Sequence, residues 1–478
     1  MKTNSAFLPP KSVSLSIFIT QFFFSFSFFG FYFILILFLK HNISLPSKSA
    51  YILFGNFVAL NYIAEFFGGL FGGRYINFRV AAIIGLFMSS FGFLFLAYFH
   101  DVNNLNVGLT LIACGTGLFL PNLRNLLGIL YQSSPSGDRD NAFTILHVFN
   151  IVGQILGPTV LSLLGLISSS WIFVGAGISL LMGGFSMLLN YHYLAIDSFD
   201  LTKKNPAATY YKAIFCIIAL IFFIYYILCN RDVKYALSIG LIILAIVLIV
   251  IVSRMKESSR TRVKTIFILY MGLIVADICF RQIFGAMNLF TDTYIDRQMG
   301  HLIIPTAMLQ SMEPVFLLMI APLVLLMRKK LEDKKIYITP GTSASMGLFM
   351  LGISFCVLAF STTLLSPKIP IIWLFLSFII MACAELFLLP IIMSALSELS
   401  PTHWRGLMMG IFALSTSIAS YLSGFLGEVI SPISGETSLS TYGAVFLDLG
   451  LFAASSSVIL FFVWKYWQQK HPNDLSDL

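Results

Sequence analysis

Long apolar segments alternate with short polar stretches along almost the whole chain. Most of the segments contain twenty or more residues, which is the length a helix needs to cross a bilayer. Strands with open edges would leave backbone groups unpaired in lipid, so these segments are expected to be helices. We predict fourteen transmembrane helices, at 14–39, 50–72, 79–99, 106–131, 142–165, 167–191, 211–229, 234–253, 264–290, 302–327, 341–364, 369–396, 406–428 and 440–466.

The charges in the loops predict the orientation of these helices. Basic residues gather in alternate loops, at 74–79, 254–264 and 328–335, while most of the intervening loops hold few of them. Lys40 and Lys48, in the first of those intervening loops, are the exception. Because basic loops stay on the cytoplasmic side, both termini are expected to be cytoplasmic.

Two of the predicted spans differ from the others. Segments 211–229 and 234–253 are almost uniformly apolar and contain few small residues for close helix packing. We interpret them as an inserted two-helix hairpin. The expected organisation is a six-helix bundle at 1–191, a linker and accessory hairpin at 192–263, and a second six-helix bundle at 264–478. Two such halves are the plan of a secondary transporter.

Composition narrows the class of protein. The chain is 58% hydrophobic and only 10% charged, against about 25% charged residues in typical soluble domains. Its net charge of +8 is spread over short loops and does not indicate nucleic-acid binding. The first apolar run is too long for a signal peptide and is expected to be a retained span. The six cysteines show no metal-binding or disulfide spacing, and we expect no cofactor. With no catalytic motif present, the chain is not expected to be an enzyme.

One acidic residue lies near the middle of a predicted span. Glu385 stands in MACAELFLLP, five residues before Pro390. A carboxylate at that depth costs roughly 2.5–3.5 kcal/mol on insertion scales unless it faces a cavity or a partner. We therefore take Glu385 as a functional candidate, with a structural ion pair between two helices as the alternative.

Several motifs occur in an order that resembles a known transporter family. GLFGGRYINFR at 69–79 is similar to the basic loop of the major facilitator superfamily. GTGLFLPN at 115–122 and NIVG at 150–153 follow it, and SMEP at 311–314 and AEL at 384–386 lie in the second half. Together they resemble the proton-dependent oligopeptide transporter (POT/PTR) family.

That resemblance implies a function and some of the residues that carry it. It implies a major facilitator fold and proton-coupled, alternating-access transport of short peptides or peptide-like solutes. The expected partners are that solute, protons and the lipid bilayer, and the expected location is the bacterial inner membrane. The counterpart of Glu385 receives the peptide amino terminus, and Asn150 and Tyr62 match positions in the same cavity. Arg281 and Gln282 are further candidates for substrate binding.

The first span departs from the family pattern. The family has E-x-x-E-R-F-x-x-Y-G, but Gln21, Phe24 and Ser25 stand at the positions of the two acids and the arginine. Tyr32 replaces another arginine, near the peptide carboxylate, and is the candidate substrate contact there. Leu120 replaces a lysine. These losses argue against the usual route of proton coupling and against ordinary di- and tripeptides.

The same half gains two charges. Arg124 follows Leu120 by one helical turn, and Glu65 follows Tyr62 by three residues. We hypothesise that Glu65 and Arg124 form a relocated ion pair, because uncompensated charges are costly at this depth. The alternative is that Arg124 extends to the cytoplasmic interface.

The second half contains further ionisable residues. Asp277 and Arg281 are four residues apart and can pair along one helix face, either as a brace or as substrate contacts. Glu313 stands at a position where the family usually has Asn, and is a candidate for substrate binding and proton coupling together with Glu385. Crowded carboxylates disfavour joint ionisation, so at least one is expected to hold a proton. His147 is interpreted as a packing residue or, less simply, as a titrating group.

Two other functions remain open on the sequence alone. The aromatic first span and the missing charges also fit an uncoupled facilitator, or an exporter of another small metabolite. A receptor or assembly partner that does not transport, built on a transporter scaffold, is the third possibility.

Overall fold

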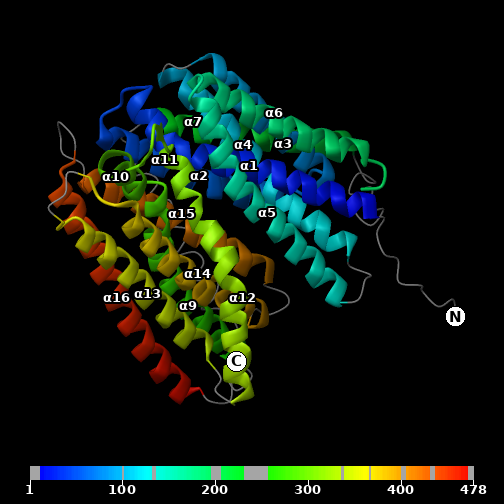
Figure 1. Ribbon diagram of the computed structural model, residues 1–478. Coiled ribbons are helices and arrows are strands. Elements are labelled where there is room, and N and C mark those ends of the chain that lie inside the picture. The colour runs from blue at the N-terminus through cyan, green and yellow to red at the C-terminus, as the bar shows by residue number, and fades with distance from the viewer. Residues whose placement is uncertain are drawn as a thin grey trace. The chain divides into compact units, whose positions relative to one another are not determined.

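The structure is a computed structural model that describes residues 11–99, 102–131, 136–194, 206–230, 257–334, 338–364, 368–399, 405–430 and 437–471. Helices account for most of these residues (Figure 1). The elements are α1 (Lys11–His41), α2 (Ser47–Phe71), α3 (Phe78–Tyr98), α4 (Val102–Leu130), α5 (Ser136–Gly165), α6 (Ser169–Leu189), α7 (Pro206–Cys229), α9 (Glu257–Phe280), η4 (Arg281–Ile283), α10 (Ala286–Tyr294), β1 (Gln298–Met299), β2 (Leu302–Ile303), α11 (Thr306–Gln310), α12 (Met312–Asp333), α13 (Pro340–Ser361), α14 (Ile371–Leu399), α15 (Arg405–Ile430) and α16 (Leu439–Lys470).

The helices confirm an all-α polytopic architecture. Within the described ranges, 12 helical segments are long and apolar enough to cross a membrane, and they correspond to twelve of the fourteen predicted spans. The predicted span 406–428 is also helical, as α15. The predicted span 234–253 lies outside the described residues, so the count of fourteen stays a prediction.

The chain divides into two compact units. Unit 1 comprises Met1–Leu45 and Asn56–Arg231, and unit 2 comprises Pro46–Gly55 and Asp232–Leu478. In unit 1, α1 packs against α5 and α6, and α3 packs against α4 and α6. In unit 2, α13 packs against α14 and α16, and α9 packs against α13, α14, α15 and α16. The predicted boundaries at 191 and 263 stay predictions.

Helix α7, the first helix of the predicted hairpin, lies on the outside of unit 1. It packs against α4, and Ala213 is buried beside Ile76 and Ala81. The opposite face exposes large apolar side chains, including Phe215 and Phe222. An apolar exposed face on a peripheral helix suits contact with lipid, as expected for an accessory helix.

Glycines allow the helices of unit 1 to approach closely. A Cβ atom on Gly157 of α5 would lie 2.1 Å from the carbonyl oxygen of Phe26 on α1. A Cβ atom on Gly68 of α2 would lie 2.1 Å from the carbonyl oxygen of Gly117 on α4. Close backbone contact through small residues is the usual way in which membrane helices associate.

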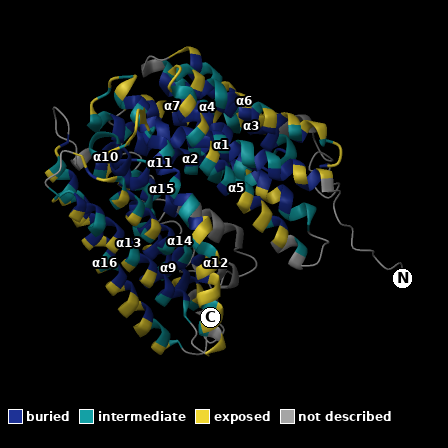
Figure 2. Cartoon of the chain, viewed as in Figure 1, coloured by how far each residue is buried: buried dark blue, intermediate teal, exposed yellow. Residues whose placement is uncertain are grey.

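The outer faces of several helices expose apolar side chains (Figure 2). On α16, Ile459 and Phe462 are both more than 60% exposed. Such residues would be unfavourable in water and are favourable against hydrocarbon. The pattern supports the assignment as an integral membrane protein.

Two predicted spans of unit 2 are interrupted inside the protein, which the sequence did not predict. The span that begins with α9 passes through the 3₁₀ turn η4 and Gly285 before α10 begins. The next span breaks at Ser311, between α11 and α12. Pro314 explains the second break, because it has no N–H group to donate to Gln310 and its ring would clash with that carbonyl. Interrupted helices are typical of binding sites in transporters.

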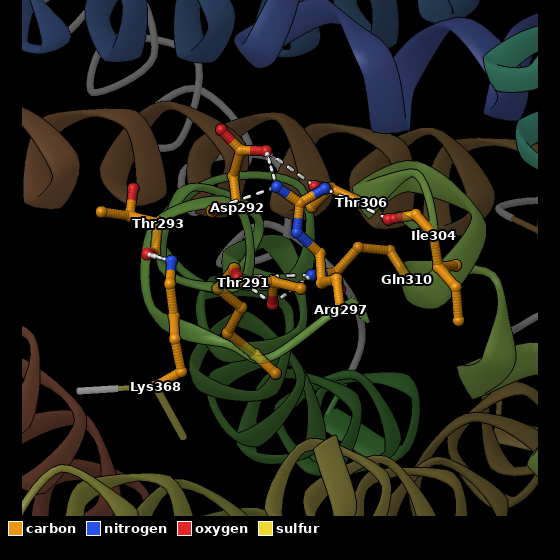
Figure 3. A network of polar contacts seen from close by, with 9 residues as sticks. Thr291, Asp292, Thr293, Arg297, Ile304, Thr306, Gln310 and Lys368 are labelled. Carbon is orange, nitrogen blue, oxygen red and sulfur yellow. Dashed lines mark hydrogen bonds and ion pairs between the residues drawn. The ribbon is translucent and has the colours of Figure 1, made fainter. Parts of the chain in front are cut away.

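A polar network holds the connection between α10 and α11 (Figure 3). The guanidinium group of Arg297 lies 3.0 Å from the Asp292 carboxylate and also donates to the carbonyl oxygen of Ile304. Thr306 Oγ1 donates to Asp292 Oδ1 at 2.8 Å. The short hairpin of β1 and β2, with Gln298 opposite Ile303, lies between these residues. Asp292 therefore ties the end of α10 to the start of α11.

Replacing Asp292 by Asn is expected to lower the free energy of unfolding by about 1–2 kcal/mol, because a partly buried charge-assisted contact is lost. Thermal unfolding in detergent measures this change. Asp296→Asn is the matched control, since the exposed Asp296 carboxylate accepts only a local bond from the backbone of Gln298. Equal unfolding temperatures for the two variants would contradict the role assigned to Asp292.

Candidate functional site

Unit 2 brings four of the predicted site residues together. Asp277 on α9 lies near Arg281 in η4, one turn further along the chain. Glu385 on α14 lies near both of them and near Glu313 at the start of α12. Thr416 of α15 lies beside Asp277. The cluster contains three carboxyl groups and one guanidinium group.

The closest contact in the cluster joins two acids. The carboxyl groups of Glu313 and Glu385 lie within hydrogen-bonding distance of each other. Glu313 is 8% exposed, and Glu385 is partly buried. Two carboxylates at this distance repel each other strongly, and a hydrogen bond between them requires a shared proton. The pair is therefore suited to bind and release one proton.

The interrupted helices place these side chains. Glu313 lies in the first turn of α12, where the N-terminal end of the helix dipole favours a carboxylate. Arg281 and Gln282 lie in η4, where α9 ends. Gln282 Nε2 donates to Ser423 Oγ of α15 at 2.9 Å, and Gln282 is 1% exposed. The breaks thus hold a base, an amide and an acid at fixed positions.

Unit 1 contains an uncharged network at the positions where the family pattern has charges. Gln21 Nε2 donates to Asn150 Oδ1 at 2.9 Å and to Ser25 Oγ at 3.0 Å. Ser25 Oγ donates to the same Asn150 oxygen at 2.6 Å. Gln21 and Ser25 are buried. Neutral hydrogen bonds therefore connect α1 to α5 here, and Asn150 is a buried acceptor that joins the two helices.

Replacing Asn150 by Ala is expected to cost about 2–4 kcal/mol of stability, because the donors of Gln21 and Ser25 would each lose a partner at about 1–3 kcal/mol. Thermal unfolding in detergent measures the loss. Asn190→Ala is the control, because the Asn190 side chain makes one long bond of 3.4 Å to Ser186 within its own helix. The network would be refuted as a stabilising contact if both variants unfolded at the same temperature.

Other departures in α1 are filled by aromatic packing. Phe24 is 3% exposed, and its ring centroid lies 4.6 Å from that of Phe119 on α4. The Tyr32 ring is fully buried, 4.3 Å from Phe28. Tyr62 on α2 is partly buried. The contribution of Tyr32 and Tyr62 to substrate binding stays a prediction.

The two charges gained in unit 1 have separate neighbours in the structure. Glu65 Oε1 accepts a hydrogen bond from Asn61 Nδ2 at 3.3 Å, and Asn61 in turn accepts from Thr116. Arg124 is exposed, and it lies near His147. A Glu65–Arg124 ion pair stays a prediction.

The sequence interpretation missed several polar partners. It named Gln21 and Ser25 as losses but did not predict that they would bond to Asn150. It also passed over Thr416 and Ser423, which contact Asp277 and Gln282. Their spacing of seven residues, two helical turns apart in an apolar span, was the available signal. Within the described residues, no group of three His, Cys, Asp or Glu side chains could hold a metal ion.

The fold and this site together define an integral membrane protein with two helical units and a buried acidic cluster. In comparisons with solved structures, the chain matches a crystal structure of peptide transporter POT in complex with sulfate, with a TM-score of 0.84, 23% identity, and coverage of 96% of this chain and 95% of that one. A POT family transporter in complex with 5-aminolevulinic acid matches with a TM-score of 0.81, 21% identity, and coverage of 95% and 96%. These likenesses confirm the predicted major facilitator fold.

The family follows from the sequence comparisons. The model of the POT family (PTR2) matches residues 80–445, and the chain belongs to this family. The chain is 22% identical to dipeptide and tripeptide permease A of Escherichia coli (strain K12), over 99% of this chain and 96% of the relative. It is 25% identical to a peptide transporter of Yersinia enterocolitica, over 80% of each chain. Members of the family are transporters, so the expectation that this chain is not an enzyme is confirmed.

Proposed function

We propose that this protein is a secondary active transporter of short peptides or peptide-like small solutes, coupled to protons and working by alternating access. The observation that carries the proposal is the contact between the carboxyl groups of Glu313 and Glu385 inside the membrane-spanning part of unit 2. Relatives over nearly the whole chain are named as a dipeptide and tripeptide permease and as a peptide transporter, which supports the substrate class.

The proposed roles of the residues follow from their chemistry. The solute's amino group binds at Glu385 and Glu313, because an ammonium group is a good partner for clustered carboxylates. Arg281 and Gln282 orient the polar part of the solute, with Asp277 holding Arg281. Proton binding to the Glu313–Glu385 pair removes the repulsion within it and so changes the affinity of the site for a cation.

Coupling in this proposal no longer depends on the first helix. The network of Gln21, Ser25 and Asn150 holds no group that titrates near neutral pH. Asn150 then has a positioning role, holding α1 against α5. We further propose that the protein lies in a bacterial inner membrane with both termini in the cytoplasm, on the basis of its basic loops and its bacterial relatives.

Transport into proteoliposomes tests the proposal. A panel of labelled dipeptides, tripeptides and peptide derivatives is offered with and without an inward proton gradient. Uptake that the gradient stimulates supports proton-coupled transport. Uptake that ignores the gradient would point to an uncoupled facilitator, which the neutral first-helix network would favour. Binding without uptake would point to a receptor.

A further inference from the structure

The acidic cluster of unit 2 is not balanced by basic groups. Asp277, Glu313 and Glu385 are accompanied by Arg281 alone. Arg281 already lies near two of the three carboxyl groups, so its charge is used within the cluster. A solute carboxylate placed here would meet more negative than positive charge, and its lost hydration would not be replaced.

Two buried oxygen atoms of the site lack a donor. Glu313 Oε1 and Gln282 Oε1 have no hydrogen-bond partner among the described residues. Both side chains are more than nine-tenths buried. Buried acceptors without partners are costly and are usually completed by a ligand or by water. An ammonium group supplies three N–H donors and one positive charge, which fits both the acceptors and the excess of acid.

Unit 1 supplies no cation that would hold a carboxylate. Its first six spans contain only Glu65, Arg124 and His147 as acidic, basic or histidine side chains away from their ends. Arg124 is exposed and lies late in its helix. Residue 120, one turn earlier, is a partly buried leucine. Buried aromatic rings and neutral hydrogen bonds occupy the corresponding part of α1.

We infer that the preferred solute is a cationic amine without a free carboxylate, such as a peptide amide or another aminoacyl compound, and not a zwitterionic peptide. The inference rests on the proposed transport function and names its substrate class. The ammonium group binds the oxygens of Glu313, Gln282 and Glu385. The other end of the solute is neutral, because the chain offers it no unshared cation.

Uptake of three matched compounds tests the inference in proteoliposomes that contain the full chain. The compounds are labelled alanyl-alanine amide, alanyl-alanine, and N-acetyl-alanyl-alanine. The amide is expected to have a half-saturating concentration at least tenfold below that of the free acid, and the acetylated acid is expected not to enter. Equal values for amide and acid, or a preference for the acid, would overturn the inference and leave the transport function standing. No uptake of any compound would overturn the transport function and this inference with it.

A charge introduced at residue 120 gives a second test. Leu120→Lys would supply the missing cation, and it is expected to narrow the difference between amide and acid by about tenfold or more. Leu120→Met is the control, because it keeps an apolar side chain of similar size. Thermal unfolding first verifies that both variants are folded. A folded Leu120→Lys variant with the wild-type preference would count against the inference.

Discussion

Replacing Glu385 by Gln is expected to abolish accumulation of the solute against its gradient while exchange of solute across the membrane continues. A glutamine amide is neutral and can donate to Glu313, so it imitates a Glu385 that never releases its proton. An imposed gradient of about two pH units is worth about 2.7 kcal/mol per proton, or about 100-fold accumulation. The variant should lose this whole factor in a proteoliposome uptake assay, while counterflow should persist.

Two further variants make this first prediction specific. Glu313→Gln should give the same loss, because either acid completes the proton-binding pair. Asp448→Asn on α16 is the control, since Asp448 is an exposed acid of the same unit. The predicted role of the pair would be wrong if Glu385→Gln or Glu313→Gln accumulated solute as the wild type does.

Replacing Gly157 by Ala is expected to prevent normal folding of unit 1. The added methyl group would lie 2.1 Å from the backbone carbonyl oxygen of Phe26, and α1 and α5 would have to separate. Overpacking of a side chain already costs about 1–3 kcal/mol, and backbone can move less easily than a side chain. We expect a fall in unfolding temperature, and a loss of folded protein during purification, both measured in detergent.

The chain provides a close control for this second prediction. Gly183 of α6 also faces α1, but a Cβ atom there would lie 3.5 Å from its nearest neighbours, in ordinary contact. Gly183→Ala should therefore fold with an unfolding temperature near that of the wild type. Similar losses for both variants would show that general sensitivity of the helix contacts, and not the Phe26 approach, limits stability.

Hydropathy predicted the helices well but not their interruptions. A long apolar run is a strong signal because the bilayer fixes the length of a span. The breaks at Gly285 and Ser311 lie inside such runs, where average hydropathy does not change. They depend on local features, such as the missing N–H of Pro314, and on tertiary contacts such as that of Gln310 with Thr291 of α10.

The candidate site was predictable in part. Asp277 and Arg281 were expected to be neighbours because residues four apart share a helix face. The contact of Glu313 with Glu385 joins two separate helices, and hydrophobic periodicity carries no information about such a pairing. The network of Gln21, Ser25 and Asn150 was missed for the same reason, although the loss of charge at these positions was evident.

Proton movement driven by the solute tests the central claim most directly. Proteoliposomes containing a pH-sensitive dye, with the membrane potential clamped and no initial pH gradient, receive the panel solute that is taken up best. We predict acidification of the interior that follows solute entry in the wild type and is absent in the Glu313→Gln/Glu385→Gln double variant. Solute entry into wild-type liposomes without acidification would contradict coupling through this pair.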